Sequence, residues 1–218
     1  MSECKPVAFP ITANEKLLQD DGAAKIDSKY FRSLVGSLIY LTNLRSNILY
    51  SVSIISRFMK NPNKLHLAAT KRILRYLQGT KNHGILYKQQ DEKRLIGYSD
   101  SDWAGSYDDR KSTSEYVFCL GTNIISWCSR KQSFIALPFA EAEYIAVNKV
   151  VCQSVWLRRI LCDLQQNILD PTTIFCDNMP GIAMTKNPVF HARSKHIELR
   201  HHFIREMVSK KEIRLEFI

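Results

Sequence analysis

Residues 95–105, LIGYSDSDWAG, mark a change in the character of the chain. Before them, apolar residues recur at steps of three and four, which is the spacing of amphipathic helices. The stretch itself predicts a short strand that runs into an acidic turn, with Asp100 at the end of the strand. Because strand ends and helix starts can converge on one spot in an α/β sheet, Asp100 is a candidate functional residue.

The residues that follow predict strands and helices in an order typical of a mixed sheet. Strands are expected at 115–120 and 123–129 (joined by a tight Gly121-Thr122 turn), 172–177 and 212–218; a long helix at 139–164; a short helix or turn at 179–187; and a basic helix at 194–211. An antiparallel start followed by strand–helix units predicts an α/β fold, a mixed sheet with helices packed on it.

The first part of the chain predicts helices only. After a loop-like start, residues 29–59 predict one or two amphipathic helices, Asn61-Pro62-Asn63 breaks them, and residues 64–78 predict another helix. After Gly84 the period of the apolar residues changes.

Charge is distributed unevenly between the two parts. Residues 1–94 hold 16 Lys/Arg against 7 Asp/Glu, a net charge of +9, whereas residues 95–218 hold 15 against 14, a net charge of +1. The basic balance favours a polyanionic partner, nucleic acid before an anionic membrane. We expect no membrane span and no signal peptide, because no apolar run is long enough. The six cysteines form no C-x-x-C spacing, so we expect a reducing, intracellular setting.

Three acids sit at the edges of apolar elements: Asp100, Glu143 near the start of the long predicted helix, and Asp177 at the end of a predicted strand. Three carboxylates brought together would repel one another unless a cation neutralised them. Oxygen ligands without His or Cys favour Mg²⁺ or Mn²⁺, and two such ions about 4 Å apart can cleave a phosphodiester. The alternative is that strand ends carry Asp for turns and helix starts carry Glu for the helix dipole.

Five strings resemble the Pol polyproteins of copia-type LTR retrotransposons, in the family order. They are residues 30–80, GYSDSDWAG (97–105) with residues 108–118, AEAEYIA (140–146), IFCDN (174–178) and residues 187–206. The resemblance implies that residues 1–90 are the helical thumb/connection end of a reverse transcriptase and that residues 91–218 are an RNase H-like domain.

The same resemblance implies the activity and the site. It assigns Asp100, Glu143 and Asp177 as catalytic and metal-binding residues for two Mg²⁺ (or Mn²⁺) ions, with Asp102 and Glu141 as near misses. The implied substrate is the RNA strand of RNA:DNA hybrids, and the implied partner is the rest of the Pol polyprotein. Cations expected to contact nucleic acid, unless they only form solvated helix faces, are Lys64, Lys71, Arg72, Arg75, Arg193 and Lys195.

Departures from the family keep other interpretations open. The Tyr-x-Asp-Asp polymerase hairpin is absent, and the family's fourth acid, after the last strand, has no counterpart before Ile218. The alternatives are therefore a catalytically impaired, truncated nucleic-acid-binding relic, a structural connection module, and a host-acting effector suggested by the R-x-L-R string at residues 72–75. Four histidines do not fit a hard-metal site and are expected to be scaffold or nucleic-acid contacts: His191, His196, His201 and His202.

Overall fold

The computed structural model describes residues 4–12, 16–90, 94–136, 139–177, 182 and 195–218, with the backbone alone for residues 139–140 and 195–201. The chain forms two compact units. The first comprises Met1–Leu86 with Ser106–Arg110, and the second comprises Tyr87–Gly105 with Lys111–Ile218. No helix in the described part of the chain is long and apolar enough to cross a membrane.

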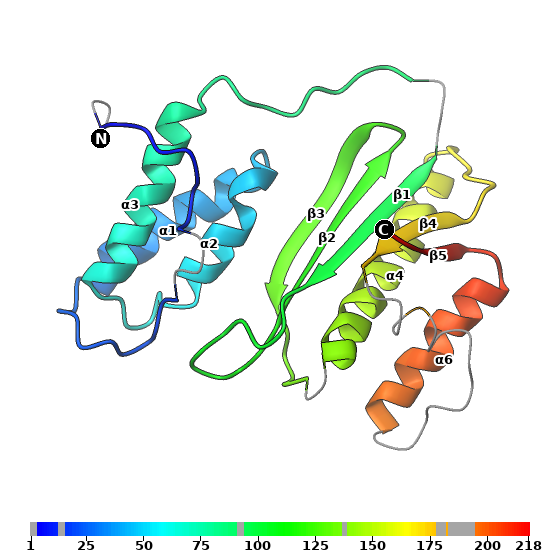
Figure 1. Ribbon diagram of the computed structural model, residues 1–218. Coiled ribbons are helices and arrows are strands. Elements are labelled where there is room, and N and C mark those ends of the chain that lie inside the picture. Colours follow the sequence, from blue (N-terminus) through cyan, green and yellow to red (C-terminus); the bar gives the residue numbers. More distant parts are fainter. Residues whose placement is uncertain (1–3, 13–15, 91–93, 137–138, 178–181, 183–194) are drawn as a thin grey trace. The chain divides into compact units, whose positions relative to one another are not determined.

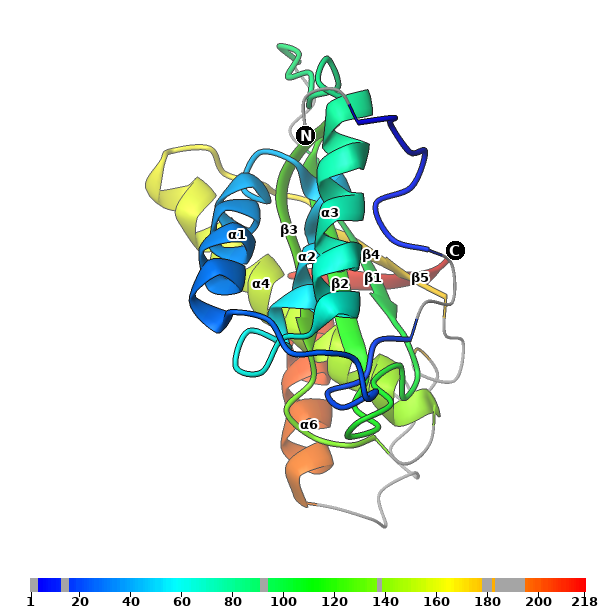
Figure 2. The same ribbon diagram turned by 90° about the vertical axis from the view of Figure 1, so that its left-hand side faces the viewer.

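The first unit is helical, as its apolar spacing predicts. It contains α1 (Ser28–Leu41), the short 3-10 helix η1 (Ser46–Ile48), α2 (Leu49–Ser56) and α3 (Lys64–Gly79), and α2 packs against both α1 and α3 (Figure 2). The predicted helical region 29–59 is thus divided by η1. The buried core of this unit consists of Phe31, Val35, Leu38, Ile48, Val52, Ile55, Ala69 and Ile73.

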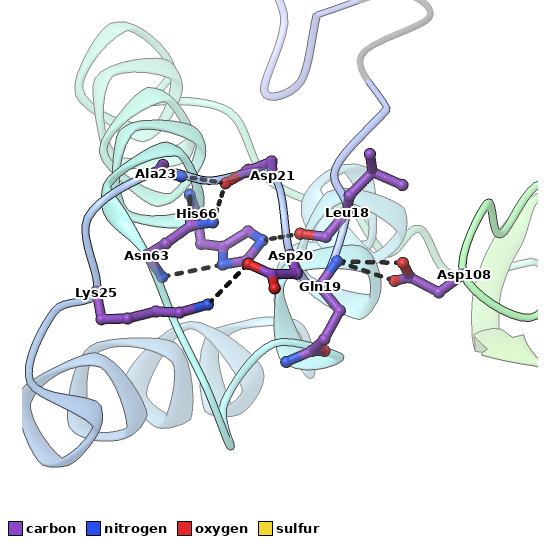
Figure 3. A network of polar contacts seen from close by, with 9 residues as sticks. All are labelled: Leu18, Gln19, Asp20, Asp21, Ala23, Lys25, Asn63, His66 and Asp108. Atoms are coloured by element: carbon purple, nitrogen blue, oxygen red, sulfur yellow. Dashed lines mark hydrogen bonds and ion pairs between the residues drawn. The ribbon is translucent and has the colours of Figure 1, made fainter.

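A buried polar network fixes the start of α3 (Figure 3). Asn63 caps the helix by accepting the His66 N–H at 3.0 Å, and the Asn63 N–H donates to His66 Nδ1 at 3.1 Å. Since Nδ1 accepts, His66 Nε2 carries the proton and donates to the Leu18 carbonyl at 2.9 Å. Asp21 accepts from the Asn63 side-chain amide at 2.7 Å. Burial lowers the pKa of His66, whose ring also stacks on Phe58. The ring is therefore a neutral structural element.

The second unit is built on one five-stranded mixed sheet (Figure 1). Its strands are β1 (Leu95–Ser101), β2 (Thr113–Leu120), β3 (Asn123–Lys131), β4 (Thr172–Cys176) and β5 (Ile213–Phe217), in the spatial order β3-β2-β1-β4-β5. The β1–β2 and β2–β3 pairs are antiparallel, and β1–β4 and β4–β5 are parallel. The predicted α/β mixed sheet is confirmed.

Two helices, α4 (Phe139–Asp163) and α6 (Lys195–Ser209), pack against this sheet and against each other. Strand side chains alternate between the faces, so Leu95 of β1 and Phe118 of β2 enter the core beneath α4. Gly97 of β1 pairs directly with Phe118 of β2, and a Cβ at this position would come within 2.7 Å of the Phe118 ring. The central strand therefore carries glycine where the aromatic ring crosses its backbone.

None of the six cysteines forms a disulfide. Cys176 is buried, whereas Cys152 and Cys162 are exposed on α4. The helix or turn predicted for residues 179–187 lies, apart from Ile182, outside the described residues.

Candidate active site

Asp100 lies near the carboxyl end of β1, the middle strand of the sheet. Antiparallel β2 pairs with β1 on one side and parallel β4 pairs with it on the other. Ser99 and Ser101 point into the protein, and Asp100, between them, is exposed. The sheet thus fixes the backbone of Asp100 while its carboxylate remains open to solvent.

Asp177 follows β4 directly and is also exposed. The parallel register pairs Ser99 of β1 with Cys176 of β4. One further step along both strands brings Asp177 beside Asp100, because parallel neighbours advance together. The convergence expected of strand ends is therefore produced by the register of this one strand pair.

Glu143 comes from the first turns of α4 and has no exposed surface. Carboxylate oxygens of Asp100, Glu143 and Asp177 lie within 4.8 Å of one another. Among the described residues, these three side chains form a group that could hold a metal ion. The sequence-predicted trio is thus assembled in one place. Its assignment to catalysis stays a prediction.

Neither carboxylate oxygen of Glu143 has a hydrogen-bond partner among the described residues. An unpaired buried charge is costly, so the protein binds a proton or a cation there instead. Burial raises the pKa of Glu143 to about 8, and the nearby charges of Asp177 and Asp100 add to the effect. A cation would be an alternative to this proton. The ligand set, three carboxylates without His or Cys, fits Mg²⁺ or Mn²⁺.

The two near misses have other places. The Asp102 carboxylate accepts a hydrogen bond from the N–H of Thr113, the first residue of β2, and lies against Gly105. Glu141 stands in the first turn of α4 and is half-buried. Neither belongs to the group around Glu143.

One further acid, Glu115 of β2, is the cross-strand neighbour of Asp100. The Ser129 hydroxyl donates to its carboxylate at 2.6 Å. Burial raises the pKa of Glu115, against the effect of this hydrogen bond, and the charges of Asp100 and Asp102 raise it further. Sequence reasoning did not assign Glu115 to the site. The antiparallel register, once known, would have placed it beside Asp100.

No family model matches the chain. The "Retrovirus-related Pol polyprotein from transposon RE1" of Arabidopsis thaliana is 42% identical over 215 residues, which are 99% of this chain and 15% of that protein. The chain belongs to the Pol polyproteins of copia-type retrotransposons. It spans about 15% of the length of the Pol relative, so the activities of a whole Pol polyprotein are not thereby its own.

The chain is also similar to a second curated protein and to a solved structure. The "Secreted RxLR effector protein 161" of Plasmopara viticola is 40% identical over 128 residues, 58% of this chain and 90% of that protein. Among solved structures, a foamy viral protease–reverse transcriptase in complex with double-stranded DNA matches 91% of this chain and 33% of its own, with a TM-score of 0.50 and 12% identity. At that identity the likeness concerns the fold alone.

The cations predicted to bind nucleic acid differ in their surroundings. Lys64 and Lys71 are exposed on α3. Arg75 is half-buried and donates from Nε to the Lys5 carbonyl at 2.9 Å, so its guanidinium also ties the N-terminal segment to the helix. Arg72 is half-buried, and its Nε has no hydrogen-bond partner among the described residues.

The remaining predicted contacts lie in the last third of the Pol segment. Arg193 and His191 fall outside the described residues, as do the side chains of Lys195, His196 and His201; His202 is exposed on α6. The nucleic-acid role of all these residues stays a prediction.

Proposed function

We propose that the second unit of this Pol segment hydrolyses the RNA strand of RNA:DNA hybrids with two Mg²⁺ or Mn²⁺ ions bound by Asp100, Glu143 and Asp177. The fold and the family show a coarser statement, a mixed five-stranded sheet with packed helices in a segment of a retrotransposon Pol polyprotein, and the RNase H-like assignment belongs to the proposal. The reaction and the substrate are the proposal.

The observation that carries the proposal is the state of Glu143. It is fully buried, both of its oxygens lack hydrogen-bond partners among the described residues, and two further carboxylates face it within 4.8 Å. A structural carboxylate in the core is normally hydrogen-bonded, because an unsatisfied one destabilises the fold. A site kept in this form is best explained by a cation ligand.

The three side chains would have different roles, because they differ in exposure to solvent. Glu143 would anchor the ions from the buried side, while Asp100 and Asp177 are open to solvent and would face the scissile phosphate. When bound, two divalent ions would supply an activated water and neutralise charge on the leaving oxygen. The protein's own part is to hold three negative groups together in advance, on two paired strands and one helix.

The family and the charge of the chain support this substrate class. An A-form duplex is recognised mostly by shape, through 2′-hydroxyls and phosphates. The first ninety-four residues carry a net charge of +9, and the exposed Lys64 and Lys71 are the candidate phosphate contacts there, with Arg193 and Lys195 in the other unit. We also propose the rest of a Pol polyprotein as partner, and an intracellular location.

Cleavage of a labelled RNA:DNA hybrid by the purified chain tests the proposal. We expect cleavage with Mg²⁺ or Mn²⁺, its loss in Asp100→Asn, and its retention in Glu141→Gln, which alters an acid of the same helix outside the cluster. A folded protein that leaves the hybrid intact with either ion contradicts hydrolysis. If such a protein still binds the hybrid in a salt-dependent way, it is a nucleic-acid-binding relic.

A second candidate is a host-acting role, because the effector protein of Plasmopara viticola is similar over 90% of its length. The R-x-L-R string at residues 72–75 lies inside α3, where Ile73 is buried in the core of the first unit and Arg75 bonds to the Lys5 carbonyl. The string thus has a structural explanation. If the structural explanation of the string is sufficient, replacing Arg72 and Arg75 with Lys should leave any secretion of the protein, or its uptake by host cells, unchanged.

A further inference from the structure

The side chain of Gln132 joins the sheet to the helix that carries Glu143. Gln132 follows β3 directly and continues its pairing with β2, because its backbone N–H donates to the Ser112 carbonyl at 2.7 Å. Its side-chain Nε2 donates to the Ser114 hydroxyl at 2.8 Å and to the Ala142 carbonyl at 2.9 Å. Only 2% of Gln132 is exposed.

Both acceptors adjoin residues of the candidate active site. Ala142 precedes Glu143 in the first turns of α4. Ser114 precedes Glu115 on β2, and the register pairs Ser114 with Ser101 and Glu115 with Asp100. One amide nitrogen therefore links the backbone beside Glu143 to the strand beside Asp100.

The chemistry of this link requires a carboxamide. Its nitrogen has two N–H groups and can satisfy two acceptors at once, which a carboxylate or a thioether cannot do. The amide oxygen, Oε1, has no hydrogen-bond partner among the described residues, so the side chain of Gln132 bonds to its neighbours through its nitrogen. The contact with α4 ends on a backbone carbonyl and thus fixes the helix itself.

We propose that Gln132 is a positioning residue for the metal site: it holds the first turn of α4 so that the Glu143 carboxylate lies within reach of Asp100 and Asp177. This inference rests on the proposed function, since it concerns the same three carboxylates. Without the link, α4 keeps its apolar packing along the sheet, but its first turn loses its polar anchor to β2. The expected consequence is weaker cation binding in a folded protein.

The test compares Mn²⁺ binding, measured by electron paramagnetic resonance of the free ion, in the full chain and its variants. Gln132→Met keeps the length of the side chain and removes both donors. We expect its Mn²⁺ affinity to fall about 10-fold, the lower end of the effect of losing a supporting hydrogen bond around a metal site. Deuterium exchange of residues 139–147 should become faster. With hybrid substrate, the loss should fall on kcat and not on KM, because the residue touches no substrate.

Gln153→Met is the matched control. Gln153 lies on the same helix, and its Nε2 donates to the Ser126 hydroxyl of β3 at 3.3 Å, away from the first turn. It should leave Mn²⁺ affinity unchanged. Ser114→Ala serves as the milder variant if Gln132→Met does not fold: it removes one of the two anchors and should weaken Mn²⁺ binding about threefold, the value of one modest hydrogen bond.

The outcomes separate this inference from the proposed function. If the unaltered chain binds no Mn²⁺, or if Asp100→Asn binds it equally well, the metal site itself is refuted. If the unaltered chain binds Mn²⁺ and folded Gln132→Met binds it with the same affinity, the positioning role is overturned while the metal site stands. Equal weakening by Gln153→Met would also overturn it, because general loosening of α4 would then explain the loss.

Discussion

Replacing Glu143 with Gln should stabilise the metal-free protein above neutral pH. In the folded chain the pKa of Glu143 is raised from 4.5 to about 8, so the group is protonated at pH 7, whereas in the unfolded chain it is ionised. Folding at pH 7 must then protonate a group whose pKa in the unfolded chain lies about 2.5 units below this pH. This protonation costs roughly 3 kcal/mol. The side chain of the Glu143→Gln variant would be neutral in both states and would avoid this cost.

The sign of the pH dependence follows from the same two values. A folded-state pKa above the unfolded one means that the contribution of Glu143 is fully present below pH 4.5 and is lost as pH rises towards 8. The measurement is urea unfolding in EDTA at pH 5, 7 and 8, followed by tryptophan fluorescence. The unaltered chain should lose stability relative to Glu143→Gln by roughly 1.4 kcal/mol for each pH unit in this range.

Metal addition completes this experiment. Excess Mg²⁺ or Mn²⁺ should raise the free energy of unfolding of the unaltered chain at pH 8 and have little effect on Glu143→Gln, because a ligand bound only by the folded state stabilises it. Glu141→Gln is the control for the loss of one negative charge in the same helix. If Glu143→Gln is less stable than the unaltered chain at pH 8 in EDTA, the reasoning about this buried carboxylate is refuted.

Three other predictions concern the scaffold. Burial lowers the pKa of His66 from 6.5, so His66 should stabilise the first unit fully above pH 6.5 and progressively less as pH falls below it. In urea unfolding, His66→Ala should abolish this pH dependence and lower the free energy of unfolding by about 2–3 kcal/mol. Arg158 donates to the carbonyls of Ile168 and Asp170 and to the Thr172 hydroxyl, so Arg158→Met should cost about 2 kcal/mol and speed deuterium exchange in residues 164–171; unchanged exchange would contradict this. Lys211, two residues after α6, has a φ of +57°, so Lys211→Gly should stabilise the protein by about 0.5–1 kcal/mol and raise its thermal midpoint, whereas a lower midpoint would show that no strain is relieved.

Much of the fold could be predicted from the sequence because its elements have regular periods. The predicted helix at 64–78 and the predicted strands at 123–129 and 172–177 differ from α3, β3 and β4 by at most two residues at an end. Periodicity could not show how the helical region 29–59 is divided, because η1 continues the apolar spacing of α1 into α2. Nor could it show that α1 buries Phe31 and Val35 while Tyr30 is exposed.

The candidate site was predictable to a different extent. Asp100, Glu143 and Asp177 could be named because each stands at the edge of an element, and the structure brings them together. Glu115 and Gln132 could not be named, because their relevance depends on strand register and on one contact between β3 and α4. Such partners are fixed by tertiary structure and have no periodic signal in the chain.

The parallel pairing of β1 with β4 has a consequence for how the molecule is made. The β2–β3 hairpin closes a loop of two residues and can form as soon as it leaves the ribosome, but β1 acquires its second neighbour only after α4 and β4 have been synthesised. Until then the carboxyl end of β1 lacks Asp177 beside it. A nascent chain that stops before β4 would hold the antiparallel strands β1–β3 without the cluster of Asp100, Glu143 and Asp177, so this cluster can form only late in translation.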